Sequence, residues 1–228
     1  KNKKFSAIDI MDSDVVFIDI LTHINEVSFK ENNFHSNYWT GLTTLLKKLK
    51  IKSDWLHNFY RSKSTPTFSS AQKLINMFNQ NPWQKHILAE MHLTPKIIFK
   101  SIKDYLVLYS SSKKLFLISN HFVPKNSRMN FWPLFKEEWY HSLEGKEAAD
   151  NCIKFCLLEN IFEKMPKHQL GIYIQENQPW EIALIHAWKS AGHGKIMGFP
   201  HNVVRFWDLR YYNDKRFYKN SNIDLEPI

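Results

Sequence analysis

Residues 170–199 read LGIYIQENQPWEIALIHAWKSAGHGKIMGF, and this stretch decides the fold class. The runs 170–174 and 195–199 are short and apolar, which is typical of buried strands. Between them, residues 179–191 place apolar side chains at helical spacing, and Gly192 supplies the left-handed backbone that commonly ends a helix. A strand, a helix and a strand in this order predict a βαβ unit with two parallel strands.

The beginning of the chain repeats the pattern. Residues 14–21 form a nearly continuous apolar run, residues 38–50 carry leucines at helical spacing, and residues 53–59 predict a second strand. Two strand–helix–strand units favour an α/β fold, and we expect a Rossmann-like parallel sheet flanked by helices.

The middle of the chain, from about residue 69 to 122, is mostly helical in pattern, with breaks near Pro82 and Pro95. We interpret it as a helical insertion or cap within a domain that spans residues 1–222. Residues 223–228 resemble the start of a linker, so the chain is expected to be a fragment that continues into a further domain.

Composition limits the possible functions. The chain has 228 residues, of which 43% are hydrophobic, and its formal net charge is +9. The charge comes mostly from scattered lysines, which suits either a solvated surface or a polyanionic partner such as a nucleotide sugar. We predict no nucleic-acid partner, because no helix-turn-helix, RNA-recognition or zinc module is recognisable.

Several other chemistries lack their signatures. The sequence has no GxxxxGKS phosphate loop, no GxGxxG turn and no GxSxG nucleophile elbow. Cys152 and Cys156 are four residues apart on a predicted helix, where free thiols are expected, and His193 and His201 lack metal-ligand spacing. We therefore predict no metal and no cofactor. No apolar run approaches the roughly 20 residues that cross a bilayer.

Polar side chains follow both strands of the 170–199 unit. Residues 175–178 come after the first strand and residues 200–202 after the second. Open α/β sheets bind ligands beyond the carboxyl ends of their strands, so these clusters are expected at one edge. The helix over 179–191 begins there, and its positive end favours phosphate or a carboxylated sugar.

This edge supplies the candidate catalytic residues. Glu176 is a candidate general base for an acceptor hydroxyl, although a carboxylate there can equally satisfy local N–H groups. His201, at the end of the second strand, is the candidate catalytic histidine. Asn177 and Gln178 are candidate substrate-binding residues, and so is Glu181, whose place in the first helical turn also suits a purely structural role.

Further candidates follow the helix. His193 lies between two glycines, where it either caps the helix or binds substrate. Arg205 and Arg210 are expected to bind an anionic group, because guanidinium groups recognise carboxylate and phosphate in a bidentate manner. Asp208 is a candidate substrate-binding residue that could instead pair with one of these arginines.

A long ordered signature is similar to that of a known family. It comprises GIYIQENQPWE (171–181), AWKSAGHG (187–194), His201 and RFWDLRY (205–211). Earlier segments fit as well, at residues 19–23, 36–39, 55–57 and 139–145. Together they resemble the bacterial surface carbohydrate biosynthesis proteins, which are glycosyltransferases of lipopolysaccharide O-antigen and capsule loci.

The resemblance implies a two-domain GT-B-like arrangement, similar to that of enzymes that transfer Kdo or sialic-acid-like sugars. In such an arrangement the N-terminal domain binds the acceptor and supplies the base, and the C-terminal domain holds the nucleotide sugar. This chain would be the N-terminal half, inactive alone. The implied partners are a nucleotide sugar and a glycan or lipid-linked glycan, and the implied location is the cytoplasm, with peripheral association at the inner membrane.

An alternative function remains open. The chain could be a non-catalytic carbohydrate- or partner-binding module of a polysaccharide assembly complex. That hypothesis predicts saturable glycan binding without transfer from any donor.

Overall fold

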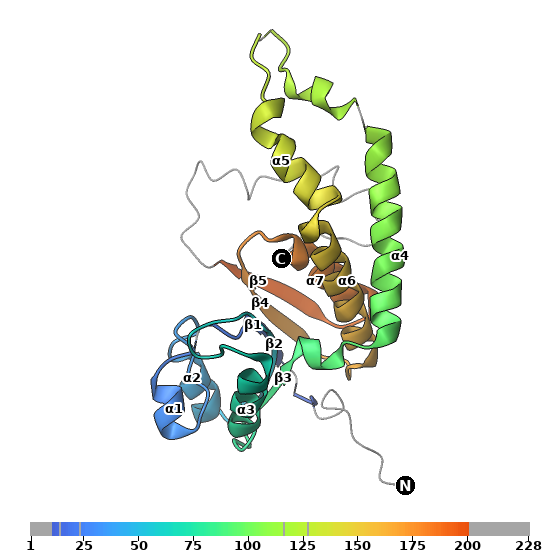
Figure 1. The fold of residues 1–228 in the computed structure, drawn as a ribbon. Coiled ribbons are helices and arrows are strands. Elements are labelled where there is room, and N and C mark those ends of the chain that lie inside the picture. Colours follow the sequence, from blue (N-terminus) through green and yellow to red (C-terminus); the bar gives the residue numbers. More distant parts are fainter. Residues whose placement is uncertain (1–10, 14, 23, 116, 127, 201–228) are drawn as a thin grey trace. The chain divides into compact units, whose positions relative to one another are not determined.

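The computed structural model describes residues 11–13, 15–22, 24–115, 117–126 and 128–200. The chain forms two compact units, one made of residues 1–92 and 158–228 and the other of residues 93–157. The first unit contains the β-sheet and the second is helical, and each is described by itself (Figure 1).

The first unit is built on a five-stranded sheet with the order β3-β2-β1-β4-β5. All four neighbouring pairs are parallel. The predicted Rossmann-like α/β fold is therefore confirmed. The strands are β1 (Val15–Ile20), β2 (Ser53–Asn58), β3 (Gln84–Leu88), β4 (Leu170–Gln175) and β5 (Lys195–Pro200).

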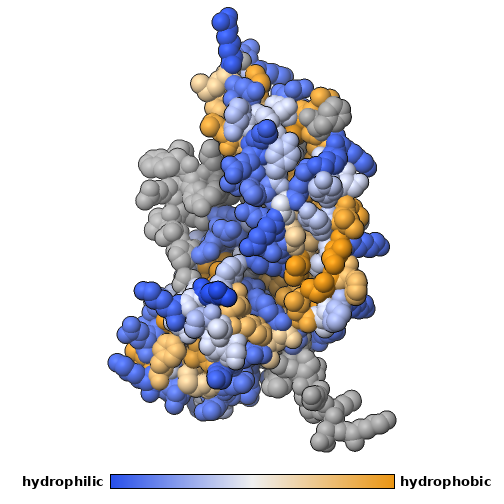
Figure 2. All heavy atoms as spheres, in the orientation of Figure 1, coloured by the Kyte–Doolittle hydropathy of each residue, from blue (hydrophilic) through white to orange (hydrophobic). Residues whose placement is uncertain are grey.

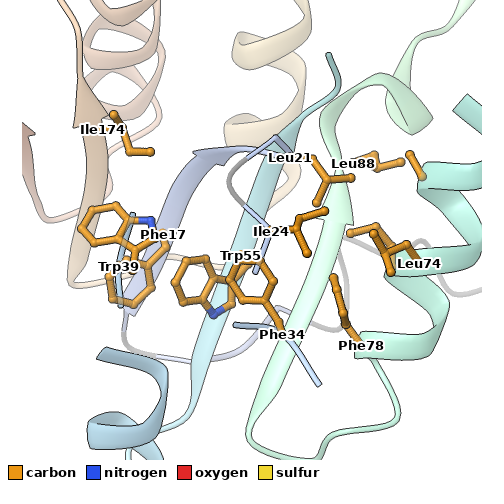
Figure 3. Packing of buried hydrophobic residues seen from close by; sticks show 12 residues of the cluster. Phe17, Leu21, Ile24, Phe34, Trp39, Trp55, Leu74, Phe78, Leu88 and Ile174 are labelled. Atoms are coloured by element: carbon orange, nitrogen blue, oxygen red, sulfur yellow. The ribbon is translucent and has the colours of Figure 1, made fainter. Parts of the chain in front are cut away.

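One face of the sheet is covered by α1 (Val27–Glu31), α2 (Leu42–Lys48), α3 (Phe68–Phe78) and the segments between them. The core on this side is aromatic (Figure 3). Phe17 of β1 stacks on Trp55 of β2 with ring centroids 4.4 Å apart, and Phe34 meets Trp55 edge-on at 4.8 Å. Burial of these large rings provides much of the driving force that holds the helical layer on the sheet.

The opposite face packs against α7 (Pro179–Ser190) and the last turns of α6 (Lys146–Lys164). Trp188 of α7 is fully buried and meets Phe162 of α6 edge-on, with centroids 5.3 Å apart. Gly171 of β4 lets this indole approach the strand, because a Cβ at position 171 would lie 2.9 Å from Trp188 Cζ2. A close approach of this kind is a typical reason for glycine inside a strand.

The second unit contains α4 (Pro95–Ser112), α5 (Trp132–Leu143) and the first turns of α6. The side-chain contacts between its helices include a 2.5 Å hydrogen bond that Tyr105 Oη donates to the Glu144 carbonyl and a 3.2 Å contact of Cys156 Sγ with Asp104 Oδ2. Among the described residues, none of the helices combines the length and the apolar character that crossing a membrane requires.

The boundaries predicted for the helical insertion need correction. The predicted range of 69–122 contains a strand, β3, as well as α3, and both belong to the sheet-bearing unit. The separate helical unit instead spans residues 93–157. The sequence of β3, QKHIL, does not show the pattern of a buried strand. Only its last two residues are apolar, although Gln84 and His86 are also buried.

Candidate functional site

The strand order identifies where a ligand is expected. From β1 the chain proceeds outward to β2 and β3, and it then crosses back to β4 and β5 on the other side of β1. The connections therefore leave β1 and β4 toward opposite faces of the sheet. Open α/β sheets bind ligands in the crevice at the carboxyl ends of two such strands. Here those ends are Ile20 and Gln175.

A buried carboxyl group lies at the end of β1. The Asp19 side chain is 1% exposed, and its Oδ2 accepts a hydrogen bond of 3.2 Å from Trp39 Nε1 while its Oδ1 accepts one of 2.6 Å from the Ile20 amide. Burial raises the pKa of Asp19 to about 7, against the lowering effect of these two donors, and the charge of Glu176 raises it further. Asp19 therefore exchanges its proton near neutral pH.

Glu176 directly follows β4, on the strand next to β1, and its side chain is half-buried. Burial is the main cause of the raised pKa of Asp19, and the charge of Glu176 adds a smaller contribution in the same direction. A buried carboxyl group of raised pKa and a more accessible carboxylate at the ends of adjacent strands are suited to acid–base chemistry. The structure thus places the candidate Glu176 at the same edge of the sheet as a buried carboxyl group, Asp19, that the sequence analysis did not single out as a site residue.

The turn between β4 and α7 is held in place by Glu181. Its Oε1 accepts hydrogen bonds from the amides of Glu176 (2.8 Å) and Gln178 (2.9 Å). Glu181 is 3% exposed, and burial raises the pKa of its carboxyl group while the amide donors lower it. Of the two roles predicted for Glu181, the structure supports the structural one, because this oxygen is committed to the backbone that positions Glu176.

Asn177 lies at the centre of the same turn. Its backbone is left-handed, with φ 59°, a conformation that asparagine tolerates better than most residues. The amide Nδ2 is buried and has no hydrogen-bond partner among the described residues. Gln178, by contrast, is exposed. Asn177 therefore carries an unused donor beside Glu176, where a ligand oxygen would satisfy it.

His193, for which the sequence left capping and substrate binding as alternatives, lies away from this group. It follows the C-terminal end of α7 and precedes β5, so it lies at the opposite edge of the sheet. Its Nδ1 accepts from the His168 amide at 3.2 Å, so its Nε2 donates to the Phe162 carbonyl at 2.9 Å. Burial lowers the pKa of His193, and both of its ring nitrogens form hydrogen bonds to the backbone within the protein interior.

The remaining predicted residues, His201, Arg205, Asp208 and Arg210, lie outside the described residues. The structure therefore tests neither the candidate catalytic histidine nor the arginines. Within the described ranges, no group of three or more His, Cys, Asp and Glu side chains is arranged to hold a metal ion.

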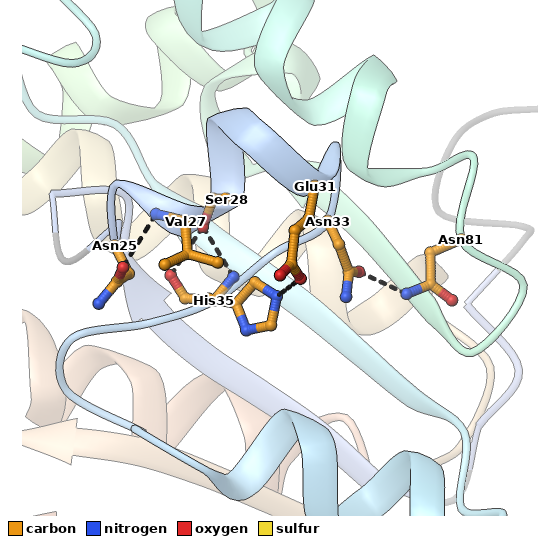
Figure 4. Close-up of polar contacts among 7 residues, drawn as sticks. All are labelled: Asn25, Val27, Ser28, Glu31, Asn33, His35 and Asn81. Atoms are coloured by element: carbon orange, nitrogen blue, oxygen red, sulfur yellow. Dashed lines mark hydrogen bonds and ion pairs between the residues drawn. The ribbon is translucent and has the colours of Figure 1, made fainter.

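A second polar site lies in the segment that follows β1. A pocket of about 270 Å³ is lined by Asn25, Val27, His35, Ser36, Asn37 and Thr40. The Asn25 amide donates to Asn37 Oδ1 at 2.7 Å. Figure 4 shows the contact of His35 Nε2 with Glu31 Oε2, which lie 2.9 Å apart. Thr40 has φ 42°, which is unusual for a β-branched residue. The lining offers amide and hydroxyl groups, which suit the hydroxyl groups of a neutral ligand.

Tyr38 connects this segment to the carboxyl edge of the sheet. Its hydroxyl group donates a 2.9 Å hydrogen bond to the Phe199 carbonyl near the end of β5. The neighbouring Trp39 reaches Asp19, as described above, and its ring lies 5.6 Å from that of Phe199. The segment that lines the pocket is thus anchored to the edge at which Asp19 and Glu176 lie.

Comparisons with known proteins leave the function open. No protein-family model matches the chain, and no curated protein matches it by sequence. Among solved structures, a short-chain dehydrogenase from Oenococcus oeni matches with 12% identity and a TM-score of 0.34 over 95% of each chain. A similarity at that level supports no argument about what the chain does.

Proposed function

We propose that the chain provides the acceptor-side half of a GT-B-like glycosyltransferase in the biosynthesis of bacterial surface polysaccharide. The observation that carries the proposal is the position of the buried Asp19 and the half-buried Glu176 at the carboxyl ends of adjacent strands, at the switch point of the sheet. Transfer of a sugar to a hydroxyl group needs a base at such a place. The sequence resemblance to surface carbohydrate biosynthesis proteins supports the same reaction.

In the proposed reaction Glu176 takes the proton of the acceptor hydroxyl group. The acceptor oxygen then forms a bond to the anomeric carbon of the donor sugar, while the bond from that carbon to the nucleotide phosphate breaks and the nucleotide leaves with the electron pair. Asp19 is too buried to contact substrate, so it acts through Glu176 as a positioning residue. The unused amide of Asn177 would bind a sugar oxygen.

The sequence-based roles of the residues beyond position 200 belong to the same proposal. His201 is the alternative base, and Arg205 and Arg210 would bind the anionic group of the donor or acceptor. Asp208 would bind substrate. The nucleotide sugar would be held mainly by a second domain, and a lipid-linked acceptor would place the reaction at the cytoplasmic face of the inner membrane.

The test uses the natural gene product with nucleotide sugars and membrane-extracted acceptors. We expect Glu176→Gln to lower turnover by at least about 100-fold, the usual size of a general-base contribution, with an unchanged melting temperature. Glu163→Gln, which alters an exposed carboxylate of α6, is the matched control and should retain wild-type turnover. Wild-type turnover in Glu176→Gln together with loss in His201→Gln would transfer the base role to His201.

The polar pocket favours a second candidate function, a non-catalytic carbohydrate-binding module. Its amide and hydroxyl lining is suited to sugar binding without any chemistry. This function predicts saturable binding of a glycan that is weakened by Asn37→Ala but not by Asn120→Ala, an exposed asparagine elsewhere. Binding of this kind without turnover from any donor would favour the module over the enzyme.

A further inference from the structure

One side of α4 is apolar although it faces solvent. Phe99 is 73% exposed, Ile102 50%, Leu106 58% and Val107 59%. The spacing of three and four residues places Phe99, Ile102 and Leu106 in one stripe along the helix, and Val107 extends the stripe to one side. Figure 2 shows hydrophobic residues gathered on the molecular surface in this region. The stripe lines a shallow groove of about 490 Å³.

The stripe is not the side by which α4 packs. Ile97, Ser101 and Ser112 are the buried residues of the helix, and Asp104 and Tyr105 form its side-chain contacts to α6 and to Glu144. These positions lie on the other side of the helix from Phe99 and Leu106. The packed side of α4 is largely polar, whereas the outer stripe is apolar and exposed. A contiguous exposed apolar surface of this kind marks an interaction site.

The charges beside the stripe are positive. Lys103 and Lys114 line the groove together with two serines, and no acidic residue lines it. Within the described part of the chain, neither lysine forms an ion pair. In the described ranges, the nearby acidic groups do not pair with these two lysines. Asp104 contacts Cys156, and Glu144 pairs with Lys113. The apolar character continues after the helix with Leu115 and Leu117, which are 44% and 56% exposed.

We propose that this face of α4, defined by Phe99, Ile102, Leu106 and Val107 with Lys103 and Lys114, docks on an anionic lipid bilayer. Apolar side chains flanked by lysine on an exposed helix are the pattern of interfacial binding, in which the rings and aliphatic groups enter the headgroup region and the ammonium groups meet lipid phosphates. The positive charge of this face favours an anionic bilayer over a second copy of the chain, because two copies of the face would bring the same lysines together.

The inference does not depend on the proposed sugar transfer. Lipid binding can be measured without donor or acceptor, and turnover can be measured with detergent-solubilised acceptor in the absence of a bilayer. Absence of lipid binding with measurable sugar transfer would contradict only the lipid-docking proposal. Lipid binding without sugar transfer would contradict only the proposed function.

The experiment is flotation of the full chain with vesicles of phosphatidylcholine alone and with vesicles in which a third of the lipid is phosphatidylglycerol. We expect binding to the anionic vesicles only, weakened by salt. Phe99→Ser with Leu106→Ser should lower the affinity by more than about tenfold, because two exposed apolar side chains no longer enter the lipid. Leu45→Ser, at a residue 49% exposed on α2, is the matched control and should bind like wild type.

Lys103→Glu with Lys114→Glu tests the electrostatic part and should abolish the preference for phosphatidylglycerol. Circular dichroism should show all variants folded, since every altered side chain is exposed. Absence of vesicle binding by the wild type would overturn the proposal, as would equal binding by the α4 and α2 variants. Self-association of the wild type that Leu106→Ser abolishes, without lipid binding, would assign the face to a second copy instead.

Discussion

The indole Nε1 of Trp39 donates a 3.2 Å hydrogen bond to Oδ2 of Asp19, and this contact joins the segment after β1 to the carboxyl end of that strand. The bond lowers the pKa of Asp19, yet burial outweighs it and leaves the value at about 7. A buried carboxyl group that changes its charge near neutrality affects both the stability of the sheet and the electrostatics around Glu176.

Replacement of Asp19 by asparagine should reveal this charge as a pH-dependent stability difference. The folded pKa of about 7 lies above the unfolded value of 3.8, so the contribution of this group is favourable at low pH and is lost as pH rises through 7. At 1.36 kcal/mol per pKa unit, the whole loss between pH 3.8 and pH 7 is on the order of 4 kcal/mol, of which about 3 kcal/mol falls between pH 5 and pH 7. Urea unfolding should therefore show that the free energy of unfolding of Asp19→Asn, relative to that of wild type, is higher at pH 8.5 than at pH 5. A difference that is constant with pH would contradict this.

Replacement of Glu181 by alanine should loosen the β4–α7 turn. Two partly buried amides, those of Glu176 and Gln178, would lose their shared acceptor, and a buried donor left unsatisfied costs about 1–3 kcal/mol. We expect the free energy of unfolding to fall by about 2 kcal/mol or more, measured by urea denaturation. Glu163→Ala removes an exposed carboxylate of α6 and should change stability by less than about 0.5 kcal/mol. Equal effects of the two substitutions would rule out this role of Glu181.

The buried histidine pair should make the fold sensitive to acid. His57 Nε2 lies 3.0 Å from His86 Nδ1, and burial lowers the pKa of His57 from 6.5 to about 3 and that of His86 well below its usual value. As the pH falls, the two histidines become protonated in the unfolded chain at a higher pH than in the folded protein. Their contribution to the free energy of unfolding is therefore fully present above pH 6.5 and is lost as the pH falls toward 3. Imidazole NMR signals of both residues should not titrate between pH 7 and 4.5 in the folded state. A midpoint near 6.5 for either one would contradict the burial argument.

Introduction of a methyl group at Gly171 should disturb the packing of α7 on the sheet. The new Cβ would lie 2.9 Å from Trp188 Cζ2, so the strand or the fully buried indole would have to shift. Overpacking of this kind costs about 1–3 kcal/mol. Thermal unfolding of Gly171→Ala should show the loss, whereas Gly41→Ala, whose Cβ would meet nothing within 4 Å, should be close to wild type. A neutral Gly171→Ala would mean that the helix moves freely over the strand.

The sequence predicted the 170–199 unit well because its signals agree with one another. Two apolar runs flank a helix whose proline, periodic apolar face and terminal glycine all mark its boundaries, and the observed elements differ from the prediction by one residue at most. The strand β3 was missed because Gln84 and His86 are buried by tertiary contacts, including the His57 pair, that no local pattern reveals.

The site was predicted in part for the same reason. Glu176 and Asn177 follow a clearly marked strand, so their edge of the sheet could be assigned from the sequence. Asp19 lies inside an apolar strand, and its pKa depends on burial and on Trp39, which is 20 residues away. The only sign of this role in the sequence is that Asp19 is a lone acidic residue near the end of a buried strand. His193 was grouped with the site because of its sequence position, although the length of α7 carries it to the other edge.

The central claim is that Asp19 is a buried carboxyl group of raised pKa at the switch point of the sheet, and that the charge of Glu176 raises this pKa further. The most direct test is a ¹³C NMR titration of the Asp19 carboxyl carbon in the wild type and in Glu176→Gln. We predict a pKa of about 7 in the wild type and a lower value in the variant, because the neighbouring charge is removed. A wild-type value near 4 that does not change in Glu176→Gln would contradict the claim.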